Sequence, residues 1–342
     1  MKALNSIRSS AVLRGTLALA ILVFPSVVQA QWRATVGAQS HDQGRQALAF
    51  LPNEIWIHAD DDITWTVDTD EIHSVTFLKA GQTRAPFTSG CAPFPPGVPP
   101  VFSPSGSTFD GSACVSTPFM VKGQTFKVIF PKAGNYKLVC LVHQNMTGTI
   151  HVLPLSAALP HSQSFYDQQA DDERKDLLSD TDQHQGHQHE DAIAVRSEFG
   201  HNAVTVGIGE IVATGGGHQS VSVLRFFSHE TVIHVGETVE WTNNDPVTPH
   251  TITFGVEPAN PIPPAGTFTV DADGALHATI SSTADNVHSG FIVAAAHERI
   301  GFPTSPLGTT RFRITFTKAG TYPYICALHD ILGMKGKIIV LP

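Results

Sequence analysis

Two stretches of the chain, TFKVIFPKAGNYKLVCLVHQNMTGTIHVLP at residues 125–154 and RFRITFTKAGTYPYICALHDILGMKGKIIVLP at residues 311–342, follow one pattern. Each contains Phe-x-Lys-Ala-Gly-x-Tyr, then Cys-x-x-His, then Met, and each closes on a β-branched run before Leu-Pro. Residues 47–77 and 223–254 also match, through Ile-His, an acidic turn, Trp-Thr and a His followed by Thr-Phe. Two blocks repeated in the same order indicate an internal duplication.

The repeats are built from short strands. Segments such as ITWTV, TFKVIF, TVEWT and RFRITF alternate apolar and polar residues, and Lys-Ala-Gly and Pro/Gly clusters mark the turns between them. This pattern predicts an all-β fold of two tandem β-sandwiches, at residues 31–154 and 200–342. Residues 155–199 predict a polar linker, flexible or partly helical, in which Phe165-Tyr166 and Leu177-Leu178 could pack on a neighbour.

The first 30 residues have the features of a secretory leader. An apolar run from Gly15 to Phe24 follows a basic start, and Val28-Gln29-Ala30 has the small-x-small pattern of a cleavage site. The apolar run is too short to span a bilayer. We therefore expect cleavage after Ala30, a periplasmic or secreted mature protein, and no membrane span in that mature protein.

The chain is acidic. It has 21 Lys+Arg against 30 Asp+Glu, a net charge of −9 with His neutral, and removal of Lys2, Arg8 and Arg14 with the leader makes it more negative still. Nucleic acid and anionic lipid are poor partners for such a chain, because both are negatively charged. A basic partner protein would suit it better.

The four cysteines divide into two pairs by their surroundings. Cys91 and Cys114 lie in a Pro/Gly/Ser-rich stretch without ligand-like neighbours, whereas Cys140 and Cys326 each precede a His by three residues. In an oxidising compartment the first pair predicts a disulfide. It would close a loop of about 23 residues and contribute roughly 3 kcal/mol to stability. The second pair predicts metal thiolates.

Each repeat supplies a possible ligand set, consisting of an early His and a later Cys, His and Met. The sets are His73, Cys140, His143 and Met146, and His250, Cys326, His329 and Met334. A thiolate and two imidazoles suit copper in both oxidation states, and a thioether provides a weak axial contact. Zinc is a poorer match because of the Met. Since the full set occurs twice, we predict one mononuclear copper site in each repeat.

These spacings resemble the cupredoxin family of type 1 blue copper proteins. Cys-x2-His-x2-Met in the first repeat is similar to amicyanin, and Cys-x2-His-x4-Met in the second is similar to plastocyanin and pseudoazurin. The resemblance covers nearly all of the mature chain outside the linker. It implies two Greek-key cupredoxin β-sandwiches, two type 1 copper ions per chain and one-electron transfer. It further implies that His143 and His329 are partly exposed electron ports, with redox partner proteins docking near them.

One position departs from the family. Those relatives usually have Pro directly before the loop His, where this chain has Val142 and Leu328. A residue other than Pro keeps its N–H, which could donate to the Cys sulfur and stabilise the reduced state. The sequence therefore suggests raised reduction potentials.

Two alternative functions make different demands on the sequence. A nitrite reductase-like or multicopper oxidase-like enzyme needs a His directly beside the ligand Cys, but these neighbours are Val139, Leu141, Ile325 and Ala327. A copper storage or delivery protein would explain the linker motif His184-Gln-Gly-His187-Gln-His189, but not the blue-site ligand sets. We therefore expect an electron carrier, not an enzyme.

The other conspicuous residues are expected to be structural or exposed. Trp65 and Trp241 are expected in the cores, and His58 and His234 are expected to be structural. The second repeat contains an insertion at residues 255–310 with three histidines expected on the surface, namely His277, His288 and His297.

Overall fold

The computed structural model describes residues 30–84, 89–92, 99–194, 202–260, 264–294 and 309–342, with the side chains of its long helix described as far as Ser179. The predicted leader lies outside the described residues, apart from Ala30. Within the described part of the chain, no helix combines the length and apolar character needed to cross a membrane.

The two repeats share one sheet of 11 strands. The first repeat contributes β1 (Gln31–Gln39), β2 (Arg45–Leu51), β4 (Asp62–Val67), β6 (Ser107–Thr108) and β8 (Thr125–Ile129). The second contributes β11 (Asn202–Ala213), β12 (His218–Phe227), β14 (Thr238–Asn244), β16 (Phe268–Val270), β17 (Leu276–Ile280) and β19 (Arg311–Phe316). The spatial order is β16-β17-β19-β14-β11-β12-β2-β1-β4-β8-β6.

Each repeat closes its sandwich with a sheet of its own. In the first repeat this sheet has the order β3-β10-β9-β5-β7, from Glu54–His58, Thr147–Leu153, Gly134–Val139, Thr76–Phe77 and Val115–Ser116. In the second it has the order β13-β21-β20-β15-β18, from Glu230–His234, Lys335–Leu341, Gly320–Ile325, Thr253–Phe254 and Val287–His288. The predicted fold class, two tandem β-sandwiches, is confirmed.

Separate hydrophobic cores fill the two sandwiches. Trp65 lies at the centre of the first core beside Phe77 and Phe130, and Trp241 lies at the centre of the second beside Phe254 and Tyr324. Both tryptophans are fully buried, as predicted. Alternating strand residues point into these cores, which explains the period-two pattern of the sequence.

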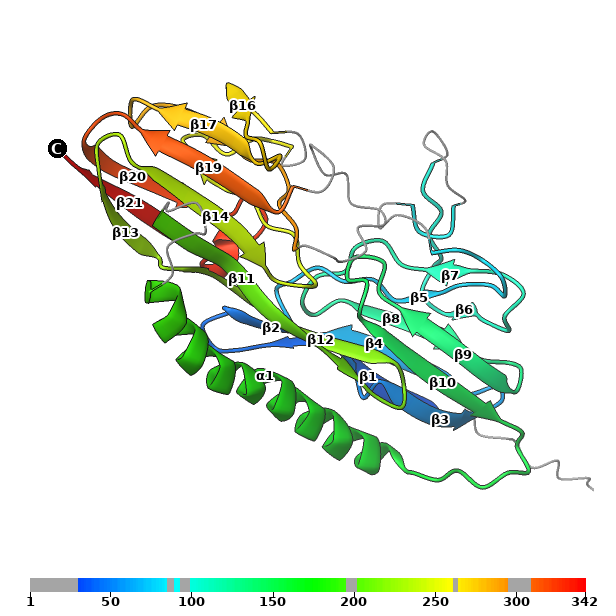
Figure 1. The fold of residues 1–342 in the computed structure, drawn as a ribbon. Helices are drawn as coiled ribbons and strands as arrows, with labels where there is room; N and C mark the ends of the chain where they lie inside the picture. The colour runs from blue at the N-terminus through cyan, green and yellow to red at the C-terminus, as the bar shows by residue number, and fades with distance from the viewer. Residues whose placement is uncertain (1–29, 85–88, 93–98, 195–201, 261–263, 295–308) are drawn as a thin grey trace, which may run out of the picture.

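The join between the repeats is a strand pair. β2 and β12, the second strand of each repeat, run antiparallel, with Leu48 opposite Ser220 and Arg45 opposite Val223 (Figure 1). Antiparallel pairing of equivalent strands relates them by a local two-fold axis. Equivalent loops of the two repeats are therefore brought toward each other.

The predicted linker contains a long helix, α1 (Gln163–Ala194), which packs on β1, β2, β11 and β12 (Figure 1). Ser162 Oγ accepts the N–H of Phe165 at the helix start. Tyr166, Ala170 and Leu177 are buried, whereas Phe165 is exposed. Of the two expectations for this segment, the structure shows the helical one, with Tyr166, Ala170 and Leu177 on the face that packs against the strands.

Candidate metal centres

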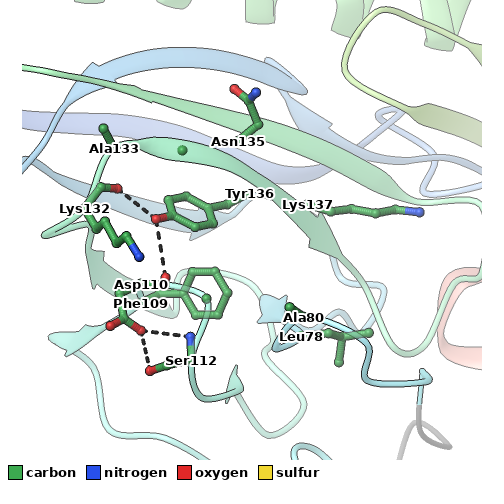
Figure 2. Close-up of a pocket in the computed structure, with 12 residues that line it drawn as sticks. Leu78, Ala80, Phe109, Asp110, Ser112, Lys132, Ala133, Asn135, Tyr136 and Lys137 are labelled. Carbon is green, nitrogen blue, oxygen red and sulfur yellow. Dashed lines mark hydrogen bonds between the residues drawn. The ribbon is translucent and has the colours of Figure 1, made fainter.

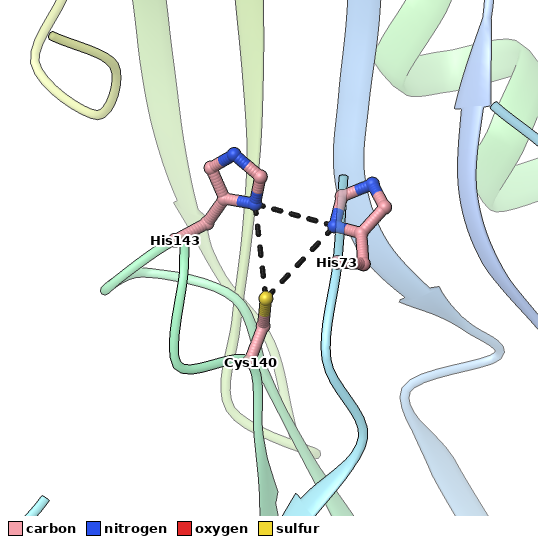
Figure 3. A group of neighbouring side chains, drawn as sticks. All are labelled: His73, Cys140 and His143. Atoms are coloured by element: carbon pink, nitrogen blue, oxygen red, sulfur yellow. Dashed lines mark hydrogen bonds between the residues drawn. The ribbon is translucent and has the colours of Figure 1, made fainter. Parts of the chain in front are cut away.

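The first centre joins a loop after β4 with the loop between β9 and β10. The backbones of His73 and Met120 exchange two hydrogen bonds, and Cys140 directly follows β9. Figure 3 shows the two rings and the thiol converging. His73 Nδ1 and His143 Nδ1 lie 3.9 and 3.7 Å from Cys140 Sγ, and 3.2 Å from each other.

The second centre repeats this arrangement. His250 forms an isolated bridge with Ile292, and Cys326 directly follows β20. His250 Nδ1 and His329 Nδ1 lie 3.8 and 3.4 Å from Cys326 Sγ, and 3.2 Å from each other. This loop is two residues longer than the first, and its Asp330–Leu332 form a single 3-10 turn before Met334.

The donor atoms fit a single metal ion in each centre. Donors placed trigonally at about 2.0 Å for nitrogen and about 2.3 Å for sulfur lie about 3.5 Å apart for two nitrogens and about 3.7 Å apart for nitrogen and sulfur. The distances above are close to both values, and all six side chains are buried. Each His–Cys–His group could therefore hold a metal ion.

In both loops the backbone of the methionine is hydrogen-bonded to the backbone of the cysteine. Met146 directly precedes β10 and its carbonyl accepts the Cys140 N–H at 3.0 Å; Met334 directly precedes β21 and its carbonyl accepts the Cys326 N–H at 3.1 Å. Both methionine side chains are fully buried. A backbone hydrogen bond thus closes the base of each loop and holds the cysteine in place.

Both thiols are surrounded by groups that favour the thiolate. Burial opposes ionisation, but the histidines hold the pKa of Cys140 and of Cys326 well below the usual value of a thiol. The backbone N–H groups of Ser74 and Thr251 lie 3.4 and 3.3 Å from the two sulfurs. Within the described residues, then, these two residues supply the hydrogen bonds to sulfur that the sequence suggested for Val142 and Leu328.

Two glycines make room for the early histidines. Gly37 and Gly207 lie at equivalent β-bulges, with φ of +69° and +61°. A Cβ at Gly37 would lie 2.6 Å from His73 Nε2, and one at Gly207 would lie 2.3 Å from His250 Nε2. Sequence reasoning missed both, although the shared Thr-Val-Gly at 35–37 and 205–207 is a signal for them.

The centres differ at the far side of the early histidine. His250 Nε2 lies 3.3 Å from Oδ2 of Asp245, and both side chains are fully buried. His73 Nε2 is buried with no hydrogen-bond partner in the part of the chain that is described. The early histidine of the second centre therefore has a carboxylate beside its Nε2, whereas that of the first centre has none within the described residues.

The loop histidines are not partly exposed, so that expectation is wrong. His143 and His329 are 2% and 3% exposed. They are covered because the two ligand loops face each other across the junction of the repeats. Their Nε2 atoms each lie 3.7 Å from a different carboxylate oxygen of Glu71. Burial opposes the ionisation of Glu71, but the nearby histidines, His143 most strongly, lower its pKa to about 2.

Two arginines stabilise the ligand loops by donating hydrogen bonds to their backbone carbonyls. Arg84 donates to the backbone carbonyls of Cys140, His143 and Gln144. Arg225 donates to the carbonyl of Leu332 at 2.8 Å and, from its other nitrogen, to the carbonyl of Asp42 in the first repeat at 2.8 Å. Arg225 thus ties the second ligand loop to the neighbouring repeat. Neither residue has a sequence pattern that would have identified it.

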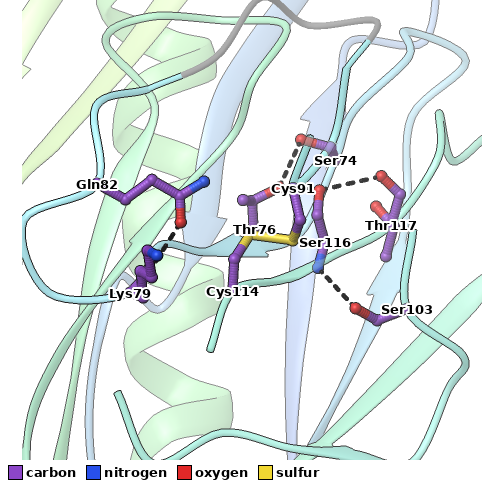
Figure 4. The surroundings of a disulfide bond; sticks show 9 residues. All are labelled: Ser74, Thr76, Lys79, Gln82, Cys91, Ser103, Cys114, Ser116 and Thr117. Carbon is purple, nitrogen blue, oxygen red and sulfur yellow. Dashed lines mark hydrogen bonds between the residues drawn. A yellow bond between two sulfur atoms is a disulfide. The ribbon is translucent and has the colours of Figure 1, made fainter. Parts of the chain in front are cut away.

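The predicted disulfide is present. Cys91 and Cys114 are bonded at an S–S distance of 2.02 Å, close to the Thr76–Ser116 hydrogen bond that joins β5 and β7 (Figure 4).

A separate surface pocket of about 520 Å³ in the same repeat is lined by Leu78, Ala80 and residues 109–112 and 132–137 (Figure 2). Its lining contains no His, Cys or Met, so it offers no soft metal donors.

The other predicted histidines have mixed outcomes. His58 Nε2 bonds the carbonyl of Ala157 and His234 Nδ1 bonds that of Pro342, in keeping with structural roles. His288 is buried, not on the surface, and its ring bonds Thr253 Oγ1. His277 is partly buried against Asp271. His297 and the side chains of His184, His187 and His189 lie outside the described residues.

A family comparison agrees with the geometry. The family model described as copper binding proteins, plastocyanin/azurin family, matches residues 37–153 and 211–341. No curated protein matched the chain. Solved structures similar to it include oxidised plastocyanin from Dryopteris crassirhizoma, at 21% identity and a TM-score of 0.23, covering 41% of this chain and 99% of that one. Another is a reduced P52G mutant of amicyanin, at 19% identity and a TM-score of 0.23, covering 37% and 87%.

The family match extends over both sandwiches and includes both His–Cys–His groups, so two copper ions could bind in each chain. With more than half of its residues matched in two segments, the chain belongs to the plastocyanin/azurin family of copper-binding proteins and carries two tandem domains of that family.

Proposed function

We propose that the protein is an exported two-domain blue copper protein that transfers single electrons through two type 1 sites. The ligands of the first are His73, Cys140, His143 and Met146, and those of the second are His250, Cys326, His329 and Met334. The observation that carries this proposal is the pair of buried, trigonally arranged His–Cys–His groups. Copper bound there would supply a reversible one-electron couple.

The protein's contribution is to hold the donors still. The imidazoles and thiols are buried, the sulfurs accept backbone N–H groups, and Arg84 and Arg225 brace the loops. Donors fixed in this way need little rearrangement when the charge at the site changes, which favours fast electron transfer.

A carrier fits the sites better than an enzyme. The alternative enzymes require a His beside the ligand Cys, and here Val139, Leu141, Ile325 and Ala327 occupy those places. A copper storage or delivery role would predict copper beyond two ions per chain.

The buried loop histidines change where a partner would dock. A cavity of about 150 Å³ lies beside both of them, with a mostly apolar lining that includes Val142, Leu328 and Ile331. Ile331 is 76% exposed at this place. We propose that redox partner proteins dock at the mouth of this cavity, since both His143 and His329 line it.

Export rests on the leader pattern at residues 1–30, with cleavage after Ala30 and a periplasmic or secreted mature protein. The proposed domains are 31–154 and 200–342, with 155–199 between them.

Optical and EPR spectroscopy with copper quantitation tests the function on the wild type, Cys140→Ser and Cys326→Ser. We expect two blue coppers per chain in the wild type and the loss of one in each variant. The double variant Cys91→Ser/Cys114→Ser is the control, since it removes two sulfurs outside the sites and should keep both signals. A colourless copper-loaded wild type would contradict the proposal, and so would turnover of nitrite or dioxygen.

A further inference from the structure

A single buried carboxylate lies between the two metal centres. Glu71 follows β4 and precedes His73 by two residues, and it is 8% exposed. Its Oε1 lies 3.7 Å from His143 Nε2, and its Oε2 lies 3.7 Å from His329 Nε2. One residue thus contacts the ligand loops of both domains.

The two histidines have the same orientation at this carboxylate. Each presents Nδ1 to the cysteine of its own centre and Nε2 to Glu71. When Nδ1 binds a metal, a neutral imidazole carries its proton on Nε2, so both rings present an N–H to the carboxylate. Among the described residues, these two rings are the ion-pair partners of Glu71.

The local two-fold relation explains why one carboxylate suffices. The antiparallel pairing of β2 with β12 makes the two ligand loops face each other. The residue two places before His250 is Thr248, whose Oγ1 bonds Ser222 Oγ at 2.7 Å. Only the first domain therefore supplies an acid at this place. Two buried carboxylates there would repel each other in a medium of low dielectric constant.

We infer that Glu71 couples the two metal centres, its carboxylate lying beside the Nε2–H of His143 and that of His329 at once. This inference rests on the proposed function, because it concerns how two type 1 sites in one chain influence each other. It makes them a linked pair, not two independent carriers.

Two consequences follow from this position. Glu71 links His143 of the first domain to His329 of the second through two contacts of 3.7 Å each. These contacts give a short route for an electron between the domains. One centre is oxidised as the other is reduced, with no bond made or broken and no proton moved. The carboxylate also stabilises the more positive, oxidised state of both centres, because it lies beside a ligand of each.

The test uses the copper-loaded full chain with Glu71→Gln and the control Asp70→Asn. Asp70 is the neighbouring carboxylate, but it bonds Gln39 and Gln43 and not a loop histidine. An EPR-monitored redox titration should show both couples of Glu71→Gln raised. We expect at least a tenfold change in the ratio of oxidised to reduced protein at fixed potential, which is about 59 mV for one electron. Asp70→Asn should leave both couples in place.

A second measurement needs no substitution. In the reduced, diamagnetic wild type, ¹⁵N NMR should show both Nε2–H groups protected from exchange with water, and Glu71→Gln should lose that protection at one ring or both. A wild type with either N–H freely exchanging would overturn the inference. So would a Glu71→Gln protein with one couple or neither shifted, or an Asp70→Asn protein with both shifted. A wild type without two blue coppers would instead refute the proposed function.

Discussion

The two metal centres are alike in their donors and unlike in their surroundings. Both have two Nδ1 atoms and one sulfur in a buried triangle, a backbone N–H donating to that sulfur, and a bulge glycine behind the early histidine. Only the second has a buried carboxylate on that histidine and a 3-10 turn in its ligand loop. The groups that could hold a metal ion are therefore the same in both repeats, whereas the charged groups around them differ.

The largest effect is expected where the centres are most alike. Gly37→Ala and Gly207→Ala would each place a methyl group within 2.6 Å or less of an early histidine, at a positive φ. We expect loss of the blue signal of that domain alone and a decrease of roughly 3 kcal/mol in the free energy of unfolding. Spectroscopy and chemical denaturation measure the two effects.

The controls are Gly123→Ala and Gly236→Ala, which have φ of +82° and +89° but open space around the added Cβ. They should lose only about 1 kcal/mol from the backbone conformation and keep both metals. A Gly207→Ala protein with two normal blue sites would show that the bulge glycine is not needed to seat the histidine.

The disulfide is a feature of the first domain alone within the described residues, and it should affect stability without affecting the metal. The double variant Cys91→Ser/Cys114→Ser should lose about 3 kcal/mol of stability, since the bond closes a long loop of the unfolded chain. Denaturation followed through the blue band of each site measures this loss, with Cys140→Ser and Cys326→Ser backgrounds to separate the sites. Equal destabilisation of both domains would indicate that they unfold as one unit through the shared sheet.

The smallest expected effect comes from Asp245, the carboxylate that distinguishes the second centre from the first. Asp245→Asn removes the negative charge beside His250, so the oxidised state of the second site loses stabilisation and its potential should rise. A tenfold change in the oxidised-to-reduced ratio would be a rise of about 59 mV. Redox titration measures it, with Glu230→Gln as a control at a surface pair with Lys337. An unchanged second site, or an equal shift at the first, would remove Asp245 as the cause of the asymmetry.

Sequence reasoning reached the fold and the members of the two His–Cys–His groups because both are encoded locally. The Trp-Thr strand and the Cys-x-x-His loop occur twice, so the ligand sets could be found by comparing the halves. Gly37 and Gly207 could have been found in the same way, from the shared Thr-Val-Gly.

The environment of the centres could not be predicted in this way. The burial of His143 and His329 depends on β2 pairing with β12, and no periodicity in either strand specifies a partner in the other domain. Glu71 is significant only because of that pairing, and it has no counterpart in the second repeat. Asp245 lies five residues before His250 and Asp68 lies five before His73, but Asp245 contacts its histidine whereas Asp68 pairs with Arg174, so the sequence alone does not distinguish the two.

The most direct test of the central claim, two type 1 sites of unequal potential in one chain, is an EPR-monitored redox titration of the copper-loaded wild type. Cys140→Ser and Cys326→Ser assign each step to a site. The carboxylate of Asp245 predicts two separate one-electron steps, with the second site, at Cys326, at the lower potential. A single step for both coppers, or a lower potential at the first site, would contradict the account.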